Sequence, residues 1–159
     1  MNAAIANDQD ELRDLYRQLI LDHARSPRHF GKLAAATHRA TGINPLCGDR
    51  LDLYLQLDES RNIVAAAFEG SGCAISVASA SLLTDGIIGL SASAAQENVR
   101  AVIAHLTAAT DITGQPLDLG KIRALDGVRK YPSRVKCATL AWHALDSALE
   151  NRPGQVSTE

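Results

Sequence analysis

The chain has 159 residues, which is enough for one domain whose core needs neither disulfides nor a metal in order to fold. Its formal net charge of -2 provides no basic excess for binding nucleic acid or an anionic membrane surface. No apolar run approaches the roughly 20 residues that a membrane-spanning helix needs, and the acidic N-terminus does not resemble a signal peptide. We therefore expect a single soluble domain over residues 1–159, located in the cytoplasm, with no nucleic-acid or membrane partner.

The N-terminal part predicts one amphipathic helix. Structure should begin near residue 8 or 10, and apolar residues recur at helical spacing from Leu12 to about residue 24, after which a Ser-Pro pair ends the helix. Residues 1–8 offer few apolar anchors, so we expect them to form a flexible tail. His23 and His29 flank the end of the helix, and we interpret both as structural or surface histidines rather than metal ligands.

The middle of the chain predicts an antiparallel hairpin. A weak strand pattern covers residues 37–43, and a much clearer one covers residues 50–57, where four leucines alternate with polar residues. A polar turn follows, and residues 63–68 supply the return strand. A hairpin brings the ends of its two strands together, so Cys47 before the first strand and Cys73 after the second should meet at one end of the sheet.

Two helices are expected after the hairpin. Small residues over 74–84 predict a helix that packs closely on the sheet, with Ser71 as its N-cap and Cys73 in its first turn. The helix macrodipole and unpaired amides there favour a thiolate over a thiol. Gly86 and Gly89 should interrupt this helix, and a second one spans about residues 94–108.

The C-terminal part predicts a loop and a short helix over residues 109–131, which could sit over a site, and then a strong amphipathic helix over 132–150. Cys137 falls near the start of that last helix, where it can converge with the other two thiols. Arg134 and Lys136 either lower the pKa of this thiol or are simply solvated helix charges. The polar residues 151–159 are expected to form a flexible tail.

The three cysteines are the residues that carry chemistry. An odd number of cysteines in a chain without an export signal argues against a disulfide framework and favours reactive or metal-bound thiols, although each could also be a small buried residue. Cys47 and Asp49 add a thiol and a carboxylate two positions apart, so the candidate site is Cys47, Asp49, Cys73 and Cys137. Such a set completes a tetrahedral zinc shell, and its sulfur atoms would also suit iron in a nascent cluster.

Three motifs resemble the SufU branch of the NifU/IscU-like iron-sulfur cluster assembly scaffold superfamily. They are Asn44-Pro45-Leu46-Cys47-Gly48-Asp49-Arg50, Gly70-Ser71-Gly72-Cys73-Ala74-Ile75-Ser76 with Ala78-Ser79-Ala80-Ser81, and Arg134-Val135-Lys136-Cys137-Ala138-Thr139-Leu140-Ala141-Trp142. The resemblance covers about residues 12–149. It implies an α+β fold in which a small antiparallel three-stranded sheet packs against about four to six helices.

Two departures from the IscU pattern favour the SufU branch. Scaffolds of the IscU type carry a histidine immediately before the third cysteine, where this chain has Lys136. They also carry a Leu-Pro-Pro-Val-Lys motif for chaperone docking, where this chain has Tyr131-Pro132-Ser133-Arg134-Val135-Lys136. The 64 positions from Cys73 to Cys137 also match the insertion typical of SufU-like proteins.

The resemblance implies a function in iron-sulfur cluster biogenesis. It implies Zn²⁺ bound by Cys47, Asp49, Cys73 and Cys137, with Arg134 in a supporting role. Cys47 would accept persulfide sulfur from a pyridoxal-phosphate (PLP) cysteine desulfurase of the SUF type, after a partner's histidine displaces it from the zinc. The protein would thus be a sulfur acceptor rather than a stand-alone enzyme, and downstream iron-sulfur assembly proteins would be further partners.

Two other interpretations of the same residues remain open. The same cysteines could hold a transient [2Fe-2S] cluster, in which case the protein is a scaffold that transfers the cluster to other proteins. Alternatively, the protein is an interaction module in which zinc is only structural. The spacing lacks the paired Cys-x-x-Cys knuckles of structural zinc modules, which favours a site whose ligands exchange.

Overall fold

A computed structural model describes residues 16–108, 120–152 and 154–158 of the chain. A first helix, which contains residues 16–25, precedes the remaining elements. These follow in the order β1 (His38–Asn44), β2 (Asp49–Leu57), β3 (Ile63–Ser71), α2 (Ala74–Ile87), α3 (Ala92–Thr107), the 3-10 helix η1 (Gly120–Lys130), α4 (Pro132–Leu149) and β4 (Gln155–Ser157). None of the helices in these ranges is long and apolar enough to cross a bilayer.

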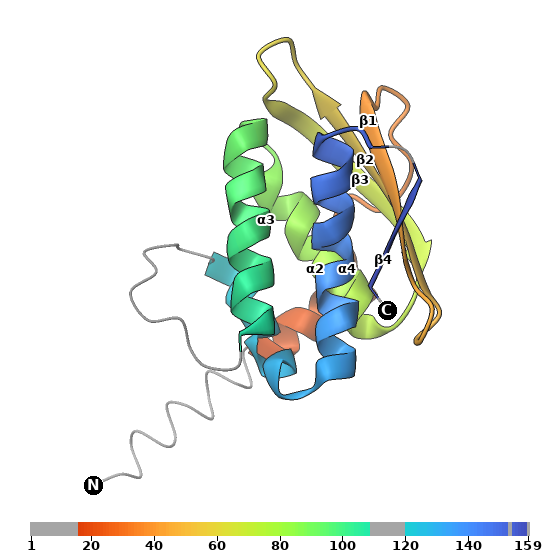
Figure 1. Ribbon diagram of the computed structural model, residues 1–159, viewed down its shortest axis with the longest axis vertical. Helices are drawn as coiled ribbons and strands as arrows, with labels where there is room; N and C mark the ends of the chain where they lie inside the picture. The colour runs from red at the N-terminus through yellow and green to blue at the C-terminus, as the bar shows by residue number, and fades with distance from the viewer. Residues whose placement is uncertain (1–15, 109–119, 153, 159) are drawn as a thin grey trace, which may run out of the picture.

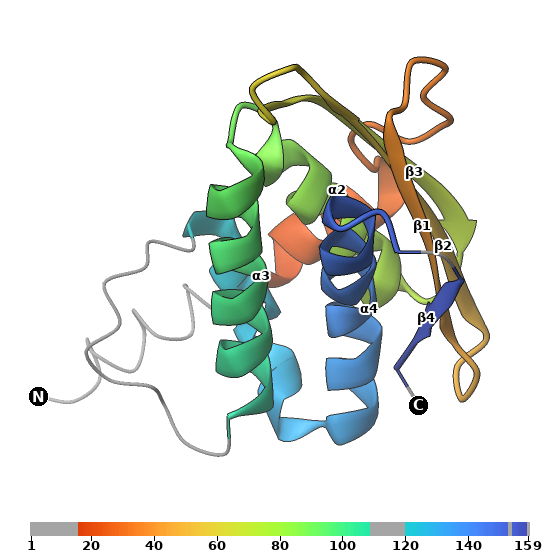
Figure 2. The same cartoon turned by 45° about the horizontal axis from the view of Figure 1, so that its top comes forward.

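The sheet and the helices form separate layers (Figure 1). The strand order is β3-β2-β1-β4, and the helices cover one face of the sheet. Helix α4 packs against β1 and β2, and α2 packs against β3, whereas α3 packs on α4 on the side away from the sheet (Figure 2). The predicted α+β class is therefore confirmed.

The sheet has four strands rather than the three expected. Strands β1, β2 and β3 pair antiparallel as predicted, but β4 adds a parallel strand at the free edge of β1, with Gln155 opposite Thr41. This strand lies within the expected tail at residues 151–159. Its polar sequence gave no strand pattern because three residues at an edge are held by backbone hydrogen bonds to β1 rather than by apolar burial. The other expected tail, residues 1–8, lies outside the described residues.

The core confirms the predicted leucine face of β2. Leu53 and Leu55 are fully buried against the helical layer, with Leu51 and Leu57 beside them. Trp142 of α4 is also fully buried, and its indole Nε1–H donates to the hydroxyl of Ser79 in α2 at 3.1 Å. That hydroxyl donates in turn to a carbonyl of α4. The small residues of α2 therefore allow close packing and also satisfy the polar atom of the tryptophan.

One helix boundary differs from the predictions, and one short helix is of the 3-10 type. Helix α2 continues through Gly86 and ends at Ile87, because the burial of Ile87 in the core outweighs the weak helix propensity of the glycine. The short helix expected before α4 is the 3-10 helix η1, and the rest of the predicted loop, residues 109–119, lies outside the described ranges.

His23 is a buried structural residue, which agrees with its interpretation from the sequence. Its Nδ1 atom lies 2.7 Å from the hydroxyl oxygen of Ser81, which also accepts the backbone N–H of Arg28 at 2.8 Å. The contact ties the first helix and the segment after it to α2. Burial, together with the nearby Arg28 charge, lowers the pKa of His23 below its usual 6.5.

Lowering the pH through 6.5, the ordinary histidine pKa, should lower the midpoint of thermal unfolding. The unfolded chain protonates His23 in this range while the folded chain holds it neutral, so the unfolded state binds more protons and is favoured. Calorimetry of wild type and His23→Gln over a pH series tests this. The slope of the unfolding midpoint against pH should become shallower in the variant. It should not vanish, because burial also lowers the pKa of His38 and His143. An identical slope in both proteins contradicts the prediction.

Candidate metal centre

Cys47 lies at the tip of the β1–β2 hairpin. The strands pair up to Asn44 and Asp49, which are opposite each other in the register. The Asn44 carbonyl accepts the N–H groups of Cys47 at 3.3 Å and Gly48 at 2.9 Å, and Gly48 has a φ of 72°, a left-handed conformation that glycine tolerates well. This tight turn leaves the Cys47 side chain exposed to solvent.

Asp49 joins the sheet to the start of α2. Its carboxylate is almost fully buried, at 2% exposure, and its Oδ1 accepts the backbone N–H of Cys73 at 2.9 Å. Its Oδ2 lies 3.9 Å from Cys73 Sγ. The β2–β3 pairing continues to Arg50 and Ser71, so the hairpin brings the segments before β2 and after β3 together, as the sequence argument expected.

Cys73 is itself the N-cap of α2. The prediction of Ser71 as N-cap is wrong, because β3 extends through Ser71 and the chain turns into the helix only after Cys73. Cys73 Sγ accepts the N–H of Ser76 at 3.4 Å. The side chain thus satisfies one of the free N–H groups at the start of the helix.

Cys137 is the sixth residue of α4 and is completely buried. Its Sγ lies 3.6 Å from Cys47 Sγ and 3.6 Å from the side-chain Nδ2 of Asn44. Burial, and then the contacts with Asp49, Cys73 and Cys47, raises the pKa of the Cys137 thiol far above its usual range. Without a metal this thiol is therefore neutral at physiological pH.

The spacing of these groups fits a tetrahedral metal ion. The ligand atoms of Cys47, Asp49 and Cys137 all lie within 4.8 Å of one another. Zinc bonds of about 2.3 Å to sulfur and about 2.0 Å to oxygen would separate two sulfur ligands by about 3.8 Å, and a sulfur from an oxygen by about 3.5 Å. The observed 3.6 Å between Cys47 and Cys137 and 3.9 Å between Cys73 and Asp49 are close to these edges. Cys73 thus lies next to the group of Cys47, Asp49 and Cys137, with its Sγ close to the Asp49 carboxylate.

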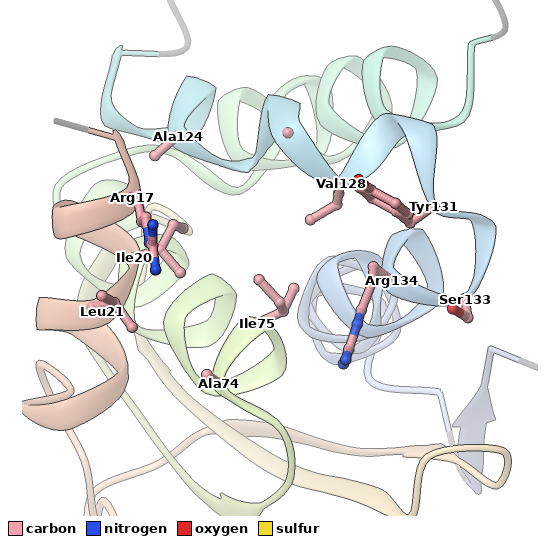
Figure 3. A pocket seen from close by; sticks show the side chains of 11 residues that line it. Arg17, Ile20, Leu21, Ala74, Ile75, Ala124, Val128, Tyr131, Ser133 and Arg134 are labelled. Atoms are coloured by element: carbon pink, nitrogen blue, oxygen red, sulfur yellow. The ribbon is translucent and has the colours of Figure 1, made fainter. Parts of the chain in front are cut away.

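Arg134 does not hydrogen-bond to any of these four residues. It is exposed on the first turn of α4, one turn before Cys137, and its side chain forms no hydrogen bond or ion pair within the described ranges. It lines a largely apolar groove next to the centre, with Arg17 of the first helix opposite and Ala74 of α2 on the floor (Figure 3). Helix η1 also borders this groove, through Ala124 and Val128.

Two residues of the centre had no role assigned from the sequence, although both lie in the quoted motifs. Asn44 contacts Cys137 across 93 positions, and no local pattern reveals such a pair. A Cβ atom on Gly72 would lie 2.5 Å from Asp49 Oδ1, so only glycine allows the carboxylate to reach the Cys73 amide. A glycine immediately before a candidate ligand was the available signal for this close approach.

Comparison with known proteins agrees with this fold. The model of the NifU-like N terminal domain matches residues 15–138, and the chain belongs to that family. Among characterised relatives, the zinc-dependent sulfurtransferase SufU of Bacillus subtilis (strain 168) is 40% identical over 90% of this chain and 95% of its own length.

Two further proteins support the same family assignment. The iron-sulfur cluster assembly scaffold protein IscU of Streptococcus pyogenes serotype M1 is 38% identical over 88% of this chain and 86% of its own length. A crystal structure described as an iron-sulfur cluster assembly scaffold for the SUF system, from Fervidobacterium islandicum AW-1, superposes with a TM-score of 0.73. It is 35% identical and covers 83% of this chain and 94% of its own.

Replacing Gly72 with alanine should weaken metal binding by about 10- to 100-fold, the usual cost of disturbing groups that orient metal ligands. The added methyl group would displace the Asp49 carboxylate from the Cys73 amide. Competition with a zinc chelator measures the change. Gly86→Ala is the matched control, because a Cβ there meets nothing within 4 Å, and it should leave zinc affinity unchanged. Equal affinities in all three proteins would falsify the role of Gly72.

Proposed function

We propose that this protein is a zinc-bound sulfur acceptor in iron-sulfur cluster biogenesis. In this proposal Cys47, Asp49, Cys73 and Cys137 hold the zinc, and Cys47 receives persulfide sulfur from a cysteine desulfurase. The observation that carries the proposal is the pairing of an exposed Cys47 thiol with a buried Cys137 thiol 3.6 Å away. The similarity to the zinc-dependent sulfurtransferase SufU of B. subtilis supports it.

The zinc, when bound, would hold the thiols as thiolates at neutral pH. The four proposed ligands then differ in how accessible they are to a partner protein. Cys137 and Asp49 are buried, and Cys73 is half-buried at the start of α2, where its Sγ already accepts an N–H group. Only Cys47 is exposed, at the tip of a hairpin turn. Cys47 is therefore the ligand that can leave the centre and meet another protein.

The transfer step needs no external oxidant or reductant. The Cys47 thiolate attacks the outer sulfur of the desulfurase persulfide, and a new sulfur–sulfur bond forms on Cys47. The sulfur–sulfur bond of the desulfurase breaks, and its cysteine leaves as a thiolate with the electron pair. Cys47 then carries the persulfide for delivery to a receiver.

The proposed sulfur donor is a PLP-dependent cysteine desulfurase of the SUF type, and the proposed receivers are downstream iron-sulfur assembly proteins in the cytoplasm. The similarity to the Fervidobacterium islandicum protein, which is described as a scaffold for the SUF system, supports this choice of system. In the proposal Arg134 supports transfer from the groove beside the centre, where its exposed guanidinium can meet a partner.

A second candidate function is assembly of a transient [2Fe-2S] cluster on the same cysteines. The similarity to the IscU scaffold protein of S. pyogenes favours it, and three thiols are ligands that iron also accepts. Anaerobic reconstitution with iron and sulfide distinguishes the two functions. A cluster that transfers to an apoprotein supports the scaffold, and failure to form one supports zinc-dependent sulfur transfer.

Cys47→Ala should abolish persulfide formation on this protein and its stimulation of the desulfurase. The variant lacks the one thiol that a partner can reach, while Cys73 and Cys137 remain. The zinc form is mixed with the desulfurase of the same organism and cysteine, and persulfide is located by mass spectrometry while alanine production gives the turnover. Val64→Ala, at an exposed apolar residue of β3, is the control and should behave as wild type.

Two results would contradict the proposal. If the zinc form of the wild type leaves desulfurase turnover unchanged, the protein does not act as the proposed sulfur acceptor. Stimulation that survives in Cys47→Ala, accompanied by lower stability, indicates that the zinc is only structural.

Arg134→Ala should slow sulfur transfer without lowering zinc content. Its side chain contacts none of the four proposed ligands, so its loss leaves the centre intact, but it removes a positive charge from the surface beside the centre. Zinc content by metal analysis and turnover of the desulfurase are measured on the same samples. Arg39→Ala is the control, because Arg39 lines a different pocket on the sheet. If desulfurase turnover is equal with the wild type, Arg134→Ala and Arg39→Ala, Arg134 has no role in sulfur transfer.

A further inference from the structure

Asn44 is a completely buried polar side chain at the end of β1. Its Nδ2 lies 3.6 Å from Cys137 Sγ, within hydrogen-bonding range of sulfur. Its Oδ1 is buried and has no hydrogen-bond partner within the described ranges. An unpaired buried acceptor destabilises a fold, and an apolar side chain of the same volume would avoid that cost. Stability alone therefore does not explain an asparagine at this position.

The charge of the centre supplies the explanation. With zinc bound, three thiolates and a carboxylate would gather at a largely buried point, and each buried negative charge needs hydrogen-bond donors. Asp49 accepts the N–H of Cys73, and Cys73 Sγ accepts the N–H of Ser76. Cys137, the most buried of the thiols, has the side-chain amide of Asn44 as its N–H donor. The exposed Cys47 Sγ accepts no N–H group from any described residue.

We propose that Asn44 is the positioning residue that makes Cys137 a fixed ligand of the centre and Cys47 the exchangeable one. This inference rests on the proposed function and adds the reason for the choice between the two thiols. The amide donates to Cys137 Sγ and holds it in place, and it would stabilise the negative charge of this sulfur when zinc binds it as a thiolate. The backbone carbonyl of the same residue closes the turn that presents Cys47 to solvent.

Asn44 thus contacts both Cys137, through its side chain, and the turn that holds Cys47, through its backbone carbonyl. The side chain acts on α4 and the backbone acts on the β1–β2 turn, so Cys47 can leave while Cys137 stays. Substitution of Asn44 removes only the side-chain part, because the turn is closed by the backbone carbonyl. The effect of a variant can therefore be assigned to Cys137.

The test compares Asn44→Leu and Asn44→Asp with wild type. Leucine keeps the approximate volume without a donor, and aspartate replaces the donor by a negative acceptor facing the Cys137 thiolate. Zinc affinity, measured by chelator competition, should fall about 10- to 100-fold in Asn44→Leu and at least as much in Asn44→Asp. The sulfur-to-cobalt absorption of the Co²⁺ form should lose the contribution of one thiolate in both variants. Asn62→Leu is the matched control, because its amide bonds only to Asp58 in a turn far along the chain.

Metal-free stability separates a positioning role from a structural one. The unfolding midpoint of metal-free Asn44→Leu should equal or exceed that of wild type, because the variant removes an unpaired buried oxygen. The stabilisation gained on adding zinc should be smaller in both variants.

The proposal is overturned if zinc affinity and the cobalt spectrum are unchanged, or if the loss of affinity merely follows a loss of metal-free stability. Asn44→Asp provides the affinity and the cobalt spectrum if the leucine variant does not fold. Failure here is distinct from failure of the proposed function, because these measurements use no desulfurase. If the wild type stimulates the desulfurase and the Asn44 variants bind zinc as tightly as the wild type, the proposed role of Asn44 is refuted and the proposed function is not.

Discussion

The hydrogen bond from the Cys73 amide to the buried Asp49 carboxylate is the interaction on which the candidate centre depends. It joins the first residue of β2 to the N-cap of α2, so it links the sheet to the helical layer at the candidate centre. A charge-assisted hydrogen bond of this kind contributes about 1.5–3 kcal/mol, and it also fixes the direction of the carboxylate. Gly72 makes the approach possible because it has no side chain to separate the two groups.

The third thiol reaches this point from the other end of the chain. Helix α4 packs across β1 and β2, and its sixth residue is Cys137, so the packing of the core also sets the position of a candidate ligand. Trp142 lies one turn and a half further along and is tied to α2 through Ser79. The centre is thus held between three elements, and its thiols range from buried to exposed. The three thiols therefore differ in how accessible they are to a partner protein.

The sequence predicted those parts of the fold that depend on local periodicity. The leucine alternation of β2 is strong because every second residue of that strand is buried. The apolar residues of α4 also recur at helical spacing, although the structure buries nearly every residue from Cys137 to Leu149 rather than one face alone. The N-cap of α2 was misassigned to Ser71, since Ser71 has the usual chemistry of a cap but is held in β3 by its pairing with Arg50. Strand β4 was missed because its partner, β1, lies more than 100 positions away and supplies only backbone hydrogen bonds.

The sequence by itself determined the residue types of the candidate centre. It also determined the hairpin that brings Asp49 and Cys73 together, because the alternation of apolar and polar side chains predicts paired strands. Only the tertiary structure decided which thiol is buried and which is exposed, and that Asn44 and Gly72 contact the candidate ligands Cys137 and Asp49. These properties depend on the packing of α4 and α2 against the sheet. Contacts between residues so far apart in the chain leave no periodic signal, so they could be found only once the layers were in place.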